Sequence, residues 1–175
     1  PIAGVARGGA LVCPPGSDTI FAFMGGNSNH FQAYSIINNT WETKASAPEV
    51  VGYGGSLVYL PASNDSIYAM QGGTPGRFWR YSIRANVWET MASLPSTVGF
   101  GGTLVHPDSS NYIYAFRGGN TADFWRYSIS GNTWETKATT PANVSYGGSL
   151  LYLGSGDTLY ALGGNGGNFW AYTLP

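Results

Sequence analysis

The stretch QGG-TPGR-FWRYSI-RAN-VWETMAS, from Gln71 to Ser93, decides the fold because the chain repeats its order. It contains a glycine pair, a short polar loop, an aromatic strand, a polar turn and a strand led by tryptophan. The same order recurs as RGG-NTAD-FWRYSI-SGN-TWETKA from Arg117 to Ala138, and a looser copy runs from Gly25 to Ser46. A shortened copy begins at Gly163. Self-similarity at a fixed period outweighs any single motif in predicting a fold.

Two glycine pairs set the register of four units. The first pairs begin at Gly8, Gly54, Gly101 and Gly147, and the second pairs begin at Gly25, Gly72, Gly118 and Gly163. A tyrosine and a tryptophan keep the same step of about 46 residues, at Tyr34, Tyr81, Tyr127 and Tyr172, and at Trp41, Trp88 and Trp134. We therefore predict one domain over residues 1–175, with units at about 1–47, 48–94, 95–140 and 141–175.

Each unit has the pattern of four short strands. In the second unit these are Gly54–Leu60, Ile67–Met70, Phe78–Ile83 and a strand that starts at Trp88, separated by turns rich in Pro, Gly, Asn and Asp. We name them strands A to D. β-Branched and aromatic residues fill the strands and no helical periodicity appears, so the chain is predicted to be all-β. Strands at this spacing and period match the four-stranded antiparallel blades of a β-propeller, with the aromatic residues mostly in the core.

The glycine pair after an apolar strand, a tyrosine eight or nine residues later and a tryptophan seven residues further resemble the kelch repeat. The resemblance covers essentially the whole chain and implies propeller blades. It does not specify a function, since kelch propellers include adaptor modules, surface proteins and a copper oxidase. The fourth unit stops before the position of its tryptophan, so its blade is expected to lack the outermost strand.

Four blades of this size leave two apolar faces to cover. We predict a head-to-tail homo-oligomer in which two chains close an eight-bladed ring. The competing interpretation is a fragment of a longer chain that carries the remaining blades.

The composition favours an uncharged surface and argues against several partners. Charged residues make up 10% of the chain and the net charge is −1, so neither nucleic acid nor an anionic membrane is an expected partner. No apolar run reaches the length of about 18 residues that a membrane helix needs. The low charge and the two lysines, Lys44 and Lys137, favour an extracellular or cell-surface setting. The single cysteine, Cys13, lies in an apolar strand and is expected to be buried.

Nothing in the sequence predicts catalysis. His30 lies between strands B and C, whereas His106 ends strand A, so the two imidazoles belong to opposite ends of a blade. The glutamates beside each strand-D tryptophan recur once per unit, which indicates a structural position. We expect no enzyme activity, no cofactor and no bound metal, and an enzyme resembling galactose oxidase is the least favoured alternative.

Recognition is the favoured function, and the residues that vary between units indicate where it occurs. The B–C loops differ most, and they share one end of the blades with the residues that precede each first glycine pair. The candidate ligand-binding residues on this face are Arg7, His30, Tyr53, Arg77, Phe100, Arg117, Asn120, Asp123 and Tyr146. The predicted ligand is a protein or a glycan. The alternative is a structural, self-assembling repeat protein, engineered or excised, whose main role is ring formation.

Overall fold

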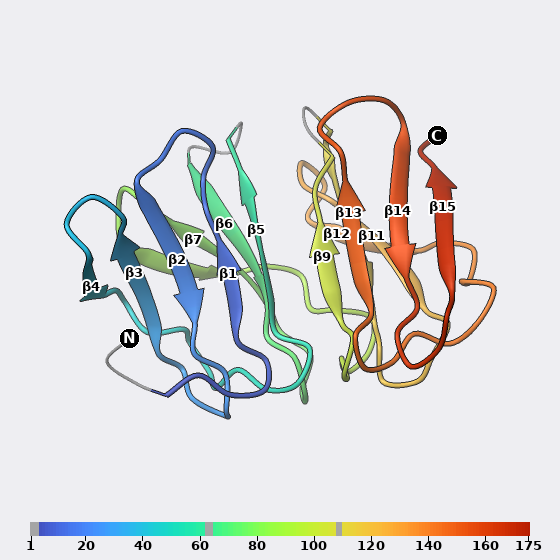
Figure 1. Cartoon of the computed structure of the whole chain (residues 1–175), viewed down its shortest axis with the longest axis horizontal. Coiled ribbons are helices and arrows are strands. Elements are labelled where there is room, and N and C mark those ends of the chain that lie inside the picture. Colours follow the sequence, from blue (N-terminus) through green and yellow to red (C-terminus); the bar gives the residue numbers. More distant parts are fainter. Residues whose placement is uncertain (1–3, 62–64, 108–109) are drawn as a thin grey trace.

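The computed structural model describes residues 4–61, 65–107 and 110–175, and this part of the chain contains strands and no helix (Figure 1). The first blade contains β1 (Ala10–Val12), β2 (Thr19–Phe23), β3 (Phe31–Ser35) and β4 (Thr40–Thr43). The second contains β5 (Ser56–Leu60), β6 (Ser66–Met70), β7 (Phe78–Ser82) and β8 (Val87–Thr90). The third contains β9 (Thr103–Val105), β10 (Tyr112–Phe116), β11 (Phe124–Ser128) and β12 (Thr133–Thr136). The fourth contains β13 (Ser149–Tyr152), β14 (Thr158–Leu162) and β15 (Phe169–Thr173).

Strand pairing confirms the predicted β-propeller blades. Each sheet is an antiparallel meander in chain order, with four strands in blades 1 to 3 and three in blade 4. The inner strands contact one another in succession, β1 with β5, β5 with β9, and β9 with β13. They lie around the middle of Figure 1, with β4 of blade 1 at the left edge and β15 of blade 4 at the right edge. The described residues contain no helix that could cross a membrane.

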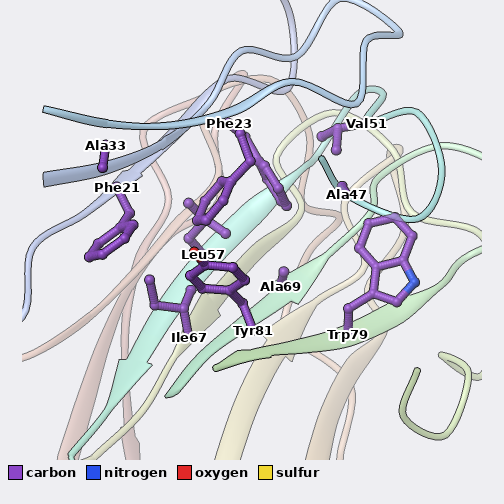
Figure 2. Packing of buried hydrophobic residues seen from close by; sticks show 11 residues of the cluster. Phe21, Phe23, Ala33, Ala47, Val51, Leu57, Ile67, Ala69, Trp79 and Tyr81 are labelled. Atoms are coloured by element: carbon purple, nitrogen blue, oxygen red, sulfur yellow. The ribbon is translucent and has the colours of Figure 1, made fainter. Parts of the chain in front are cut away.

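The core consists of three layers, one between each pair of neighbouring blades. In the first layer, Phe21 and Phe23 of blade 1 belong to one buried cluster with Ile67, Trp79 and Tyr81 of blade 2 (Figure 2). The second and third layers repeat this arrangement between blades 2 and 3 and between blades 3 and 4. Because the middle blades are covered on both faces, β6 is buried at every position.

The outermost strand of one blade reaches back to the blade before it. The Trp88 indole Nε1 donates a hydrogen bond to the Ala45 carbonyl at 2.8 Å, and the Asn86 Oδ1 accepts one from the Ala45 amide at 2.9 Å. Trp134 and Asn132 repeat both bonds on Ala92, at 3.0 and 2.8 Å. These contacts, half-buried at the tryptophans and exposed at the asparagines, fix the register between blades in addition to the apolar packing.

Cys13 corrects one expectation. It is exposed, and it lies just after β1, which ends at Val12. The Sγ atom lies near the carbonyls of Pro14 and Ser17 rather than in a core layer. An apolar run therefore did not imply burial at its last residue.

Replacing Gly72 with alanine is expected to lower the free energy of unfolding by at least about 2 kcal/mol. Gly72 has a φ of 68°, and an added Cβ would lie 2.4 Å from the Gly55 amide nitrogen and 2.5 Å from the Tyr53 carbonyl oxygen. Gly167→Ala is the matched control, since its Cβ would meet nothing within 4 Å. Urea denaturation followed by tryptophan fluorescence measures the difference in stability. Equal midpoints for the two variants would contradict the close backbone packing at Gly72.

Candidate functional site

Four predicted site residues occupy equivalent positions at one end of the propeller. Each precedes a first glycine pair, and each backbone carbonyl accepts a hydrogen bond from the second glycine pair or the residue after it. The donors are the amides of Gly26, Gly73, Gly119 and Asn165, and the acceptors are the carbonyls of Arg7, Tyr53, Phe100 and Tyr146, at 2.8–3.0 Å. The same local fold thus places one side chain per blade on the same rim. We call these four side chains the rim ladder.

Glycines at this rim allow the blades to approach closely. A Cβ on Gly8 would lie 1.9 Å from the Gly52 carbonyl oxygen of the next blade, and one on Gly101 would lie 1.9 Å from the Ser145 carbonyl oxygen. No other residue fits at such separations, so the glycine pairs are required where adjacent backbones meet. Their consequence for the site is that side chains from neighbouring blades come within stacking distance.

The rim ladder is continuous from blade 1 to blade 4. The Arg7 Nη1 donates a hydrogen bond to the Tyr53 hydroxyl at 2.7 Å, and the guanidinium carbon lies 5.3 Å from the centre of the Tyr53 ring. The ring centres of Tyr53 and Phe100 are 4.2 Å apart, and those of Phe100 and Tyr146 are 4.1 Å apart with an interplanar angle of 25°. The hydrogen bond to Tyr53 raises the pKa of the exposed Arg7 guanidinium, which keeps its positive charge.

The ladder presents ring surface to solvent. Tyr146 is 59% exposed, and Tyr53 and Phe100 are half-buried. A shallow pocket of about 200 Å³ opens beside the first two members and is lined by Ala6, Arg7, Gly26, Asn27 and Tyr53. The rim therefore combines an accessible aromatic row with one cationic hydrogen-bond donor, which suits contacts to apolar faces that also carry polar groups.

The other charged candidates are held by partners within the loops. The Arg117 Nη1 donates to the Asp123 carboxylate at 2.7 Å, and its Nε donates to the Thr97 carbonyl at 2.9 Å. The Arg77 Nε donates to the Glu49 carboxylate at 2.8 Å. These pairs brace the B–C loops against the preceding D–A connections, and the charges are partly neutralised.

His30 and Asn120 lie apart from these contacts. His30 is exposed, and its side chain makes no hydrogen bond or ion pair within the described residues. Asn120 is exposed with a φ of 63°, a left-handed conformation that asparagine tolerates, and its amide donates to the Val144 carbonyl at 2.9 Å. The structure thus joins four of the nine candidates in the ladder and two in an ion pair, and it leaves three elsewhere on the loops.

Glu49 is a site residue that the sequence prediction missed. It binds Arg77, and the Gln71 amide Nε2 also points at its carboxylate, at 3.5 Å. The repeat alignment contains a clue to this pair. Ser96 and Ala142 occupy the position of Glu49 in the next two units, and the second unit is the one whose B–C loop ends in an arginine.

Potential metal ligands are scattered in the part of the chain that the structure describes, where no three His, Cys, Asp or Glu side chains gather. His106 is 9% exposed at the end of β9, and its Nε2 lies 2.9 Å from the Ser110 carbonyl oxygen. The strand-D glutamates pair across their sheets, Glu89 with Arg80 and Glu135 with Arg126. These contacts give the repeated glutamates the structural role that their period indicates.

No protein-family model matches this chain, and no curated protein matches it. Among the solved structures that match, one titled "Structure of YjhT", a propeller-like protein, aligns with a TM-score of 0.67 and 12% identity. The alignment covers 89% of this chain and 57% of that one, so the chain spans a little over half of the matched structure. At this identity the similarity shows the fold and nothing finer.

A double-mutant cycle is expected to detect the ladder. Tyr53→Ala and Phe100→Ala should be coupled by about 0.5–1.5 kcal/mol in free energy of unfolding, because their rings touch. Tyr53 and Tyr146 make no ring contact with each other among the described contacts, so the same cycle on that pair should give a coupling below about 0.5 kcal/mol. Chemical denaturation measures both cycles, and equal coupling energies would contradict a sequential ladder.

Proposed function

We propose that this chain is a non-enzymatic, kelch-like propeller that binds a protein or a glycan through its rim ladder. The observation that carries the proposal is the stacked row Arg7–Tyr53–Phe100–Tyr146, built from four blades and partly exposed. Rigid aromatic rings supply a large contact area at low entropic cost, and an arginine beside them supplies directed hydrogen bonds. Such a surface suits the apolar face of a sugar ring or an aromatic or proline side chain of a protein partner.

The kelch assignment within this proposal is supported by what the repeated residues do. The second glycine pair accommodates the close backbone approach, the tyrosine fills the inter-blade core, and the tryptophan hydrogen-bonds to the blade before it. An extracellular or cell-surface location is proposed with it, on the basis of the low charge and the two lysines.

The proposal assigns no catalytic step to the rim. Glu49 and Asp123, the carboxylates among the rim contacts, each accept a hydrogen bond from an arginine. Both carboxylates are therefore occupied by ion pairs within the loops. Both pairs suit a role in loop positioning.

A glycan array and a displayed-peptide library are the two probes that test the binding function. Ligands selected by the wild-type chain should bind at least about tenfold more weakly to the Phe100→Ala/Tyr146→Ala variant, because about two aromatic contacts are removed. Ile37→Ala, a change at a residue that is 73% exposed outside the rim, is the matched control and should bind normally. Selected ligands that bind both variants equally would place recognition elsewhere on the chain.

A second candidate function, self-assembly into an eight-bladed ring, is favoured by the end faces. Leu11 on the outer face of blade 1 is 67% exposed, and Leu151, Leu162 and Phe169 on the outer face of blade 4 are 51–62% exposed. The equivalent positions in the middle blades are buried or half-buried in core layers, as at Leu57 and Met70. The blade 4 face of one copy therefore suits the blade 1 face of another, and two such contacts would close a two-fold ring.

Charge placed on either face is expected to abolish this assembly. The wild-type chain should sediment at twice its mass of 18.6 kDa, and Leu11→Asp and Leu162→Asp should each sediment as monomers. An equimolar mixture of the two variants should form a dimer again, since it retains one unaltered contact. Analytical ultracentrifugation measures the masses, and a wild-type monomer at tens of micromolar protein would contradict the ring.

A further inference from the structure

A second row of polar side chains lies beside the rim ladder. Each blade contributes the residue that directly follows its second glycine pair. All four of these side chains are exposed and uncharged, and none of them donates or accepts a hydrogen bond within the described residues. They are Asn27, Thr74, Asn120 and Asn165. We call these four side chains the polar row.

The fold fixes the backbone at the polar row and leaves the side chains unused. The Asn27 amide donates to the Val51 carbonyl of blade 2 at 3.0 Å, and the next hydroxyl, that of Ser28, donates to the Gly25 carbonyl at 2.8 Å. Blade 3 repeats both bonds, at 2.9 and 2.8 Å, with Asn120, Val144, Thr121 and Gly118 in the corresponding places. The neighbouring hydroxyls thus stabilise the loops, whereas the asparagine side chains are held at the seam between two blades with free donors and acceptors.

Backbone conformation alone does not account for the polar row. Asn27, Asn120 and Asn165 have φ values of 57°, 63° and 43°, in the left-handed region where asparagine and aspartate are both enriched. Aspartate occurs at none of the four positions. Thr74 has no positive φ, yet its hydroxyl also donates and accepts hydrogen bonds. The property that all four residues share is therefore an uncharged group that can do both.

The polar row lies next to the aromatic rings of the rim ladder. Asn27 lines the shallow pocket of about 200 Å³ together with Arg7 and Tyr53. In blade 3 the glycine before Asn120 donates its backbone amide to the carbonyl of Phe100. The Tyr53 and Phe100 rings are half-buried and meet at 51°, so they do not cover each other's faces completely. Apolar ring surface and free hydrogen-bonding groups thus occur side by side.

The pocket between blades 1 and 2 suits one small ring. Its volume of about 200 Å³ is below the range of about 300–1,000 Å³ that is usual for drug-sized ligands. The Tyr53 ring forms one part of its wall, and the side chains of Arg7 and Asn27 add hydrogen-bonding groups to the rest. A pyranose ring has the matching character, because its C–H groups form an apolar face and its hydroxyls surround that face.

Hydrogen-bonding character separates uncharged sugars from anions at this rim. A hydroxyl both donates and accepts, and so does an asparagine side chain, whereas a carboxylate or a phosphate only accepts. Arg77 and Arg117 are paired with carboxylates, and the Arg7 guanidinium donates to the Tyr53 hydroxyl. An uncharged ligand rich in hydroxyls therefore satisfies the whole polar row, and an anion would leave its acceptors unpaired.

Given the binding function proposed for the rim ladder, on which this step rests, we propose that its ligand is an uncharged glycan. One sugar ring occupies the pocket and packs on Tyr53, and the Asn27 side chain bonds to neighbouring hydroxyls of that ring. Further sugar units extend along the rim towards Phe100, where Thr74 and Asn120 bond to them. The ladder supplies apolar contact, and the polar row selects the arrangement of hydroxyls.

Replacing asparagine with glycine tests the polar row, because glycine adopts the left-handed conformation readily. The probes are neutral trisaccharides of glucose, galactose, mannose and N-acetylglucosamine, screened on an array and then measured by calorimetry. The affinity for the trisaccharide that binds should fall at least about threefold in Asn27→Gly and about tenfold in Asn27→Gly/Asn120→Gly, since hydrogen bonds are lost. Asn38→Gly is the matched control with unchanged affinity, since Asn38 is exposed in the turn between β3 and β4, at the other end of β3 from the rim.

Acidic trisaccharides that contain uronic acid, and displayed peptides, are assayed in parallel. Neutral trisaccharides that bind the double variant as tightly as the wild type would overturn the proposal, and so would ligands found only among the acidic sugars or the peptides. In that second case, weaker binding by Phe100→Ala/Tyr146→Ala would still support the rim as the binding surface. Absence of a ligand in all three classes would contradict both the glycan and the binding function. Circular dichroism checks that the variants are folded, and the single variant decides if the double variant is not.

Discussion

The structure depends on one constraint: a blade is apolar on both faces and needs a neighbouring blade on each. The three core layers satisfy this for blades 2 and 3, where β6 is buried throughout. Burial of aromatic rings provides most of the favourable free energy, and the tryptophan and asparagine of each outermost strand determine how one blade is seated on the one before it. Hydrogen bonds between neighbouring strands form the individual sheets, and packing of these sheets on one another forms the propeller.

The same constraint explains why exposed apolar side chains gather on the first and last blades. No blade precedes blade 1 in the part of the chain that the structure describes, so Leu11 is exposed, and the Trp41 ring there contacts Tyr34, at 5.1 Å between ring centres. Within residues 110–175 no further blade follows blade 4, and β15 is its outermost strand. Features at the two ends therefore differ from the middle in what they contact rather than in how they fold.

The repeat made the fold predictable, since aligned glycines, tyrosines and tryptophans fix both the strand number and the period. The rim position of Arg7, Tyr53, Phe100 and Tyr146 was predictable for the same reason. Their stacking was not, because it depends on blade-to-blade approach and not on spacing along the chain. The Glu49–Arg77 pair joins two loops of one unit, and aligning the repeats does not show which loops touch. The exposure of Cys13 depends on where β1 ends, which the alignment does not show either.

The scaffold and the candidate site are physically coupled at the glycine pairs. A Cβ on Gly54 would lie 2.2 Å from the Gly99 carbonyl oxygen, so the blades could not approach so closely with any side chain there. That approach brings Tyr53 and Phe100 to 4.2 Å between ring centres, although neither side chain belongs to a buried core cluster. The glycines are consequently fixed by the fold while their neighbours are free to change. A propeller built in this way can alter what its rim contacts, one blade at a time, without altering the packing that holds the blades together.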